Sequence, residues 1–398
     1  MPNNILLHLS KKSNKDEGLK PLFFDLSNKK NLQILGRLID DKKIFHISDD
    51  YEEQIRELYA INNPASVYGP MFGEQLNKYI LNLKKRVPLL KQGVWVYFPW
   101  NGSLIHILKE QDFLKVRTAR NRYLINEQEQ SKFYNSVIGI GGLSVGNSVI
   151  LSIVLQGGGR HIRIADFDRV ALSNTNRIRG SIASLGMRKA EMTARQIYEI
   201  NPYTKIEIFP IGITPENINK FFADTPKLDV VIDELDNIAV KFLIRQYAKK
   251  YKVPVVMGAD DGDNAVVDIE RYDLKPQPKF FHGRLGNTSY EQLKNLDKFG
   301  IGKTITQHIG PENITERMQQ SLLAMGKTIV SWPQLGGAAL LNGSAVAYCV
   351  RKILNNQPLE HNRAIISLDE KLIPNYNSKR EKNKRTQIGK NFKKMFGL

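Results

Sequence analysis

A group of charged and amide residues occurs between residues 166 and 260, and its members follow apolar segments: Asp166, Asn174, Arg177, Lys189, Asp236 and Asp260. Arginine, lysine and amide groups can hold phosphate oxygens, and a carboxylate can accept hydrogen bonds from ribose hydroxyls or bind Mg²⁺. Each residue alone could instead cap a helix or lie solvated on the surface. Their occurrence together favours a site for a nucleoside triphosphate and its magnesium ion.

A glycine turn precedes this group and contains Gly139, Gly141 and Gly142. It follows the apolar pair Val137–Ile138, and the apolar run from Val145 to Leu155 after it suits a helix. Glycine lets a phosphate approach the backbone and rest at the helix N-terminus, where free N–H groups favour negative charge. Because Ser144 stands where the motif G-x-G-x-x-G has its third glycine, the turn alone is weak evidence.

The elements that must position these residues alternate between strands and helices. Pro215 suits the first turn of a helix. We expect strands at 137–138, 162–165, 206–209, 229–233 and 254–257, and helices at 145–155, 186–200, 215–222 and 238–250. Such alternation predicts an α/β fold with a doubly wound, Rossmann-like, mostly parallel sheet that binds ligands at the carboxyl ends of its strands.

Two further regions flank this predicted nucleotide-binding domain, which we place at residues 116–270. Residues 1–115 are expected to form an N-terminal α+β domain that could hold a substrate or partner. Its predicted elements are strands at 22–26 and 43–47, helices at 51–59 and 73–85, and a hairpin around Asn101–Gly102. Residues 271–374 would complete the nucleotide-binding domain, and residues 375–398 would form a helical, basic extension.

The net charge of +18 is concentrated in part at the C-terminus, since residues 375–398 hold eight Lys or Arg and one Glu. Excess positive charge attracts polyanions such as ATP, nucleic acid or acidic lipid. The alternative is a solvated, partly disordered tail. No apolar run is long enough to cross a bilayer, and the N-terminus lacks a signal-peptide core, so we expect a cytoplasmic protein.

The single cysteine, Cys349, excludes an internal disulfide and paired C-x-x-C zinc ligands. It lies within an apolar helical segment, Ala345–Val350, so we expect a buried, inert thiol.

Several short motifs occur in order and with matching spacing: Asp166-Phe167-Asp168, Ser173-Asn174, Arg177, Lys189 within Gly186–Ala190, Asn201-Pro202 and residues 233–237. Together they resemble the ThiF/MoeB adenylating superfamily, which includes the ubiquitin-activating enzymes. The resemblance covers roughly residues 117–270 and resumes at 331–354, which is similar to the family's final packing helix.

The resemblance implies an ATP-dependent adenylyltransferase. ATP with Mg²⁺ would activate a carboxylate, on a carrier protein, a peptide C-terminus or a small acid, as an acyl-adenylate with release of pyrophosphate. Asp166 would hold the ribose, Asn174, Arg177 and Lys189 would hold the phosphates, and Asp236 would bind Mg²⁺. Asp168 and the three glycines would complete the nucleotide site. Arg120 or Arg122 resembles an arginine that the family supplies from a neighbouring subunit, which implies a homodimer.

This sequence departs from the family's pattern in three places. The zinc-binding cysteine pairs are absent, so we predict no structural zinc. The catalytic cysteine of the thioester-forming branch is absent too. Residues 258–263 are unusually acidic for a loop near an incoming carboxylate, and they could bind a metal, repel anions or form a solvated turn. This acidity puts a carrier-protein substrate in doubt.

Three alternative functions stay open. Ser173–Arg177 and Thr214–Asn217 have similar counterparts in the tRNA threonylcarbamoyladenosine dehydratases, and the basic charge would suit tRNA. An NAD-dependent oxidoreductase would use Asp166, which lies twenty residues past Gly146, as its ribose-binding acid. A binding module could keep the nucleotide pocket without turnover.

Overall fold

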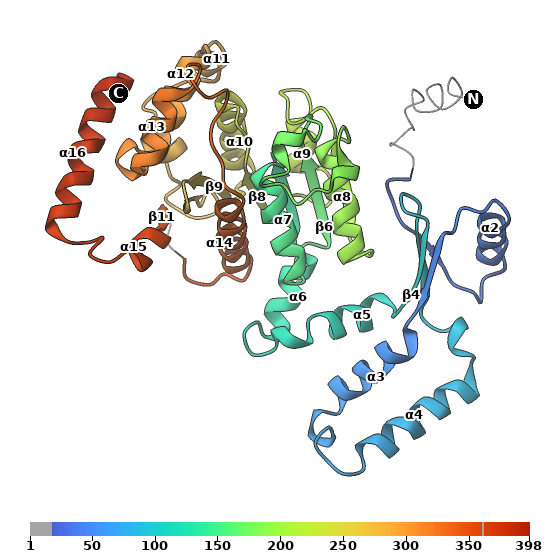
Figure 1. Ribbon diagram of the computed structural model, residues 1–398. Helices are drawn as coiled ribbons and strands as arrows, with labels where there is room; N and C mark the ends of the chain where they lie inside the picture. Colours follow the sequence, from blue (N-terminus) through green and yellow to red (C-terminus); the bar gives the residue numbers. More distant parts are fainter. Residues whose placement is uncertain (1–17, 360–361) are drawn as a thin grey trace, which may run out of the picture. The chain divides into compact units, whose positions relative to one another are not determined.

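The structure of the protein is a computed structural model that describes residues 18–359 and 362–398 (Figure 1). Two compact units are present. The first contains residues up to Asn126 together with Ile197–Tyr203, and the second contains Glu127–Gln196 together with Thr204–Leu398.

The first unit is built on a four-stranded sheet in the order β1-β3-β4-β2. β3 and β4 form an antiparallel hairpin around Asn101–Gly102, and β2 runs parallel to β4. The strands are β1 (Leu22–Phe24), β2 (His46–Asp49), β3 (Val94–Phe98) and β4 (Ser103–Ile107). The helices are α2 (Lys29–Asp40), α3 (Tyr51–Asn62), α4 (Phe72–Arg86) and α5 (Glu110–Arg117).

The predictions for this unit are largely confirmed. The two predicted helices correspond to α3 and α4, and the predicted hairpin is present. The strand expected at 43–47 lies instead at His46–Asp49. Helix α2, which buries only Leu35, was not predicted. The sequence did carry signals for it: Leu32, Leu35 and Ile39 recur at helical spacing, and the side chain of Asn28 caps the helix by accepting from the backbone N–H groups of Lys30 and Asn31.

The second unit contains a seven-stranded sheet in the order β11-β10-β9-β8-β5-β6-β7. The run from β7 to β9 is parallel, and β10 and β11 add two antiparallel strands at one edge. This sheet confirms the predicted mostly parallel, Rossmann-like fold. The strands are β5 (Val137–Gly141), β6 (His161–Ala165), β7 (Lys205–Phe209), β8 (Val230–Asp233), β9 (Val255–Asp261), β10 (Asn264–Glu270) and β11 (Arg363–Ile366).

Helices cover this sheet, and two of them, α7 and α14, pack closely together (Figure 1). A Cβ atom at Gly343 of α14 would lie 2.8 Å from the backbone of Ser148 in α7, so this contact requires glycine. The helices are α6 (Glu127–Asn135), α7 (Val145–Leu155), α8 (Lys189–Ile200), α9 (Ile218–Ala223), α10 (Ile238–Tyr251), α11 (Tyr290–Lys294), α12 (Lys298–Ile309), α13 (Glu316–Ala324), α14 (Gly336–Leu354), α15 (Leu368–Leu372) and α16 (Lys379–Phe396). Within the described ranges, none of the helices has the length and apolar character needed to cross a bilayer.

The helix predicted from Pro215 begins three residues later, at Ile218. Asn217 is the reason, because its Oδ1 accepts from the N–H of Thr214 at 2.8 Å and its Nδ2 donates to the carbonyl of Gly212 at 2.8 Å. These bonds hold a turn in which Pro215 precedes the helix.

The acidic stretch at 258–263 is largely strand. β9 continues to Asp261, Gly262 turns the chain with a φ of 65°, and β10 returns antiparallel. Asp260 and Asp261 are 7% and 3% exposed, so a solvated turn is wrong for both. Only Asp263, in the turn itself, is exposed.

The basic C-terminal segment is helical, as expected, and it is not a disordered tail. Phe392 and Phe396 of α16, one helical turn apart, are buried with Ile314, Met318 and Leu322. Burial of two aromatic side chains anchors one face of α16 and leaves its lysines to the other faces.

A buried network of charges joins α10 to the sheet. Asp233, which ends β8, forms ion pairs with Arg245 at 2.6 Å and Lys241 at 3.2 Å, and Arg245 also pairs with Glu270 of β10 at 2.6 Å. Burial alone would raise the pKa of Asp233, but Lys241 and Arg245 hold it below its ordinary value. The buried carboxylates of Asp233 and Glu270 share Arg245 as a partner, so both depend on its presence.

Replacement of this arginine tests the network. Arg245→Met should lower the free energy of unfolding by about 3–5 kcal/mol, because it leaves two buried carboxylates without their shared partner. Urea unfolding followed by circular dichroism would measure the loss. The matched control is Gln246→Met on the exposed face of α10, expected within about 0.5 kcal/mol of the parent protein. Equal stability of the two variants would contradict the role given to Arg245.

Asp261 should make stability depend on pH. Burial raises its pKa from 3.8 to about 6. Between about pH 4 and pH 6 the folded state therefore binds more protons than the unfolded state. Because of this difference, the free energy of unfolding should fall by roughly 2–3 kcal/mol as the pH rises through this window. Asp261→Asn should accordingly be more stable than the parent at pH 7. That advantage should shrink towards pH 4.5 in urea unfolding, and an advantage independent of pH would argue against this origin.

Candidate functional site

The carboxyl ends of β5, β8 and β9 border a cavity of about 360 Å³. β6 and β7 lie on one side of β5, and β8 and β9 lie on the other, so the strand order reverses beside β5. In open α/β sheets this reversal leaves a crevice in which ligands bind. The volume falls within the range of about 300–1,000 Å³ that is usual for small-molecule sites.

The glycine turn after β5 packs directly against the chain that follows β8. Gly142 has a φ of 84°, and a Cβ atom there would lie 2.2 Å from the carbonyl oxygen of Glu234. A side chain at Gly141 would meet Leu235 at 3.1 Å. Gly139 lies deeper, inside β5, where a Cβ atom would be 2.7 Å from Leu228. Close packing therefore requires glycine at position 142, and it leaves little room for a side chain at 139 and 141.

Asp166 fixes the turn from the side of β6. It is 7% exposed, and its two carboxylate oxygens accept from the N–H groups of Leu143 and Asp168, each at 2.7 Å. Burial raises the pKa of Asp166, and Lys189 opposes the rise. Lys189 itself forms an ion pair with Asp168 at 2.8 Å. The structure therefore brings Asp166, Asp168 and Lys189 together beyond the end of β6.

Arg177 contacts the same turn at Ser144, the residue after Leu143. Its Nε donates to the hydroxyl of Ser144 at 3.0 Å, and its Nη1 donates to the carbonyl of Ser173 at 3.2 Å. Asn174 shapes the loop that carries it, because its Oδ1 accepts from the N–H of Ala171 at 3.0 Å and its carbonyl accepts from the N–H of Arg177 at 3.1 Å. Asp166 and Arg177 thus contact consecutive residues of one turn.

Helix α7 begins directly after this turn, and among the described residues no side chain caps it. The first backbone N–H groups of such a helix stay available to an anion, and the helix dipole favours negative charge there. Arg177 and Asp236 both line the cavity, together with Ser144 and Val145 at the start of α7. The arrangement can hold a phosphate chain at this helix end.

Two further acids line the cavity: Glu234, which was not predicted as a site residue, and Asp260, which was expected at this edge of the sheet without an assigned role. Glu234 follows β8 and accepts from the N–H of Gly258 at 2.8 Å, and burial, opposed by Lys241, raises its pKa well above the ordinary value. Asp260 accepts from the side chain of Asn342 at 3.1 Å, and burial raises its pKa to about 6. The strand was predicted to end at residue 257, but β9 continues to Asp261, so Asp260 reaches the cavity from the strand itself and not from a loop.

The opposite wall of the cavity is mostly apolar and comes from α12 and the segment before α14: Ile301, Ile305, Ile309, Met325 and Trp332. His308 lies in this wall and is 1% exposed, with its ring against Phe281 at 4.9 Å between centroids. Burial lowers the pKa of His308 well below its ordinary value, so the imidazole is neutral. Neither ring nitrogen has a hydrogen-bond partner in the part of the chain that the structure describes.

The remaining predicted residues lie elsewhere. Arg120 is in the turn Ala119–Asn121 of the first unit and Arg122 follows it, so their approach to the phosphates stays a prediction. Cys349 is buried and its pKa is raised to about 11 by burial, which confirms the expected inert thiol.

Asp236 is exposed and offers the kind of carboxylate that Mg²⁺ shares with phosphate oxygens. Across residues 18–359 and 362–398, no three His, Cys, Asp or Glu side chains are grouped to hold a metal ion by themselves. A magnesium ion here would therefore need oxygen ligands from the nucleotide as well.

Comparisons with known proteins identify the central segment. Residues 118–271 match the ThiF family. The chain is 32% identical over 332 residues to the uncharacterized protein MT1398 of Mycobacterium tuberculosis, which covers 83% of this chain and 46% of that protein. It is 29% identical over 175 residues to the tRNA threonylcarbamoyladenosine dehydratase of Escherichia coli, covering 44% of this chain and 62% of the enzyme. The sulfur carrier protein adenylyltransferase of Thermus thermophilus is 31% identical over 124 residues, covering 31% of this chain and 44% of that enzyme.

This chain spans less than two thirds of each of these three relatives. The family match contains the glycine turn, Asp166, Arg177, Lys189 and Asp236. Residues 118–271 therefore form a ThiF-family domain.

Proposed function

We propose that this protein is an ATP-dependent adenylyltransferase that activates a carboxylate as an acyl-adenylate and releases pyrophosphate. The observation that carries the proposal is the turn after β5, which Asp166 and Arg177 contact on consecutive residues beside a cavity that Asp236 also lines. The similarity to a sulfur carrier protein adenylyltransferase supports the same reaction class.

In the proposed complex, Asp166 accepts from the ribose and the phosphates lie over the start of α7. Arg177 neutralises phosphate oxygens, Lys189 adds positive charge, and Asp236 holds the magnesium ion together with phosphate oxygens. A substrate carboxylate oxygen then attacks the α-phosphorus, the bond to the bridging oxygen of the β-phosphate breaks, and pyrophosphate leaves. An ionised carboxylate needs no general base, so catalysis rests on positioning and charge neutralisation.

The rest of the substrate acid would occupy the apolar end of the cavity, against α12 and Trp332. Asp260, with a pKa of about 6, carries negative charge at neutral pH and disfavours a carboxylate beside it. The substrate carboxylate would therefore turn towards Arg177.

The principal test is exchange of labelled pyrophosphate into ATP, with peptides ending in glycine and small apolar acids as candidate substrates. Arg177→Ala and Asp236→Ala should each lower the exchange rate about 100-fold or more, because each removes a charge that stabilises the transition state. Two exposed residues outside the cavity supply matched controls, Arg179→Ala and Asp263→Ala, which should keep the parental rate. Full exchange by Arg177→Ala would exclude the role given to this arginine.

Calorimetry with ATP and with NAD separates the remaining alternatives. Tighter binding of NAD than of ATP would favour an oxidoreductase. ATP binding without exchange for every acid tried would favour a binding module.

A second candidate is a tRNA-modifying enzyme that acts on threonylcarbamoyladenosine. The similarity to a tRNA threonylcarbamoyladenosine dehydratase and the net charge of +18 favour it. Deletion of residues 375–398 would be a poor test, since it removes Phe392 and Phe396 from the core. Charge neutralisation on the exposed face of α16 leaves that core intact.

If tRNA is the substrate, its affinity for the protein should fall steeply as the salt concentration rises. Most of the affinity at low salt should survive when four exposed basic residues of α16 are replaced by glutamine: Lys379, Arg380, Lys384 and Lys394. Filter binding over a salt series would measure this. Loss of all affinity in the fourfold variant would instead indicate non-specific attraction by α16 and would remove the charge argument for a tRNA substrate.

A further inference from the structure

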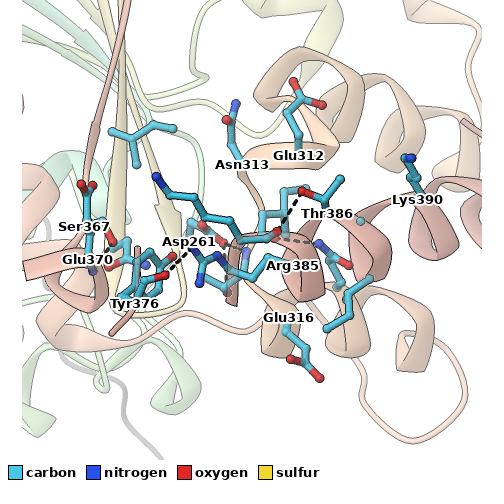
Figure 2. A pocket seen from close by; sticks show the side chains of 18 of the residues that line it. Asp261, Glu312, Asn313, Glu316, Ser367, Glu370, Tyr376, Arg385, Thr386 and Lys390 are labelled. Atoms are coloured by element: carbon cyan, nitrogen blue, oxygen red, sulfur yellow. Dashed lines mark hydrogen bonds between the residues drawn. The ribbon is translucent and has the colours of Figure 1, made fainter. Parts of the chain in front are cut away.

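A second cavity, of about 560 Å³, lies in the second unit and shares no lining residue with the first (Figure 2). Its walls come from the β9–β10 turn, the short helix Pro311–Asn313, α13, β11, α15 and α16. The function proposed above makes no use of it.

One wall offers a buried carboxylate. Asp261 is 3% exposed, and its Oδ1 accepts from the N–H of Thr315 at 2.9 Å and from its hydroxyl at 3.2 Å. Burial raises the pKa of Asp261, and the neighbouring acid Asp369 adds to the rise. A positive charge brought to this carboxylate would therefore be stabilised.

Beside it, Gln319 presents a carbonyl oxygen that lacks a donor. The side chain is 5% exposed, and its Nε2 donates to the carbonyl of Ile314 at 2.8 Å, which fixes the orientation of the amide. Its Oε1 is buried and has no hydrogen-bond partner among the residues described. An unpaired buried carbonyl costs about 1–3 kcal/mol, so a ligand that supplies an N–H here recovers that free energy.

The wall formed by α16 is basic. Arg385 is held by a hydrogen bond from Nη2 to the carbonyl of Tyr376 at 2.8 Å, and its guanidinium lies 3.7 Å from the centre of the Tyr376 ring. Figure 2 shows both residues at this cavity, together with Asp261. A guanidinium carries five N–H donors, and one held in place in this way is suited to bind a carboxylate.

The charges around the cavity balance. The acids are Asp261, Glu312, Glu316 and Glu370, and the bases are Lys382, Arg385, Lys390 and Lys393. Glu312 and Lys393 already pair with each other at 3.1 Å. A polyanion such as a nucleotide would meet the acids, and a simple cation would leave the basic wall without a partner.

We propose that this cavity binds a small zwitterion, an amino acid or a short peptide with both termini free. Its ammonium group donates to Asp261 and to Oε1 of Gln319, and its carboxylate accepts from Arg385. The site is separate from the proposed adenylation site, so either assignment can fail without the other.

Calorimetry on the full chain tests this with alanine, dialanine and trialanine as probes. At least one should bind saturably, and its N-acetylated form and its C-terminal amide should each bind about tenfold more weakly or worse, since each lacks one charge. Absence of saturable binding by all three probes at millimolar concentration would overturn the proposal. Equal binding of the parent probe and its two blocked forms would overturn it as well.

Three variants locate the site. Asp261→Asn keeps an acceptor for Thr315 but loses the charge. Gln319→Met keeps the approximate shape but loses the acceptor, together with the donor to the carbonyl of Ile314, and Arg385→Gln loses the guanidinium. Each should weaken binding of the probe about tenfold while ATP affinity stays unchanged and unfolding remains a single cooperative transition. The control is Lys384→Gln, which lies on α16 outside the cavity and should bind like the parent. Undiminished binding by all three variants would place the probe elsewhere.

Discussion

The contact of Gly142 with the backbone of Glu234 is the constraint on which the candidate site depends. It brings the end of β5 against the end of β8, and only glycine fits, since a Cβ atom would lie 2.2 Å from a carbonyl oxygen. Asp166 then fixes Leu143 and Arg177 contacts Ser144, so the start of α7 has a defined position. The free N–H groups at a helix N-terminus attract anions, and fixed neighbouring residues give such a site a precise geometry.

The chain at the end of β8 faces the buried charge network first and the cavity next. Asp233 points into the buried network with Arg245, whereas Glu234, Leu235 and Asp236 line the cavity. The network fixes the strand end from which these residues project. It also ties that end to Glu270 of β10 through Arg245. Thus the end of β8 is fixed by the ion pairs of Asp233 and by the contact of Gly142 with Glu234. These two constraints explain how Asp236 can keep a defined position at the edge of the cavity although it is exposed.

Local patterns in the sequence predicted the parts of the site that are local in the chain. The glycine turn, α7 and the acid at the end of β6 follow one another within 30 residues, so spacing alone placed them. Residues that reach the cavity from distant parts of the sequence could not be placed by spacing in this way. Asp260 was expected at this edge, but its burial in the cavity wall follows only from the extension of β9 past residue 257. His308 could be placed only from the packing of α12 over the strand ends. For α16, the sequence predicted the basic, helical character but not the packing. Phe392 and Phe396 can be recognised as core residues only once α13 is known to lie against them.

The two ends of the first cavity differ in origin. The charged end, with Arg177, Glu234 and Asp236, falls inside the ThiF-family match at 118–271, whereas the apolar end, with α12 and Trp332, falls outside it. Similarity to relatives therefore supports the roles proposed for the residues at the charged end, which would face the nucleotide. The choice of carboxylate would instead depend on residues 301–332, including a neutral imidazole without a partner in the described chain. Under the proposed function, the substrate acid would carry a polar group beyond its apolar portion, because a ligand that supplies a hydrogen bond to a buried imidazole without a partner in the described chain gains free energy.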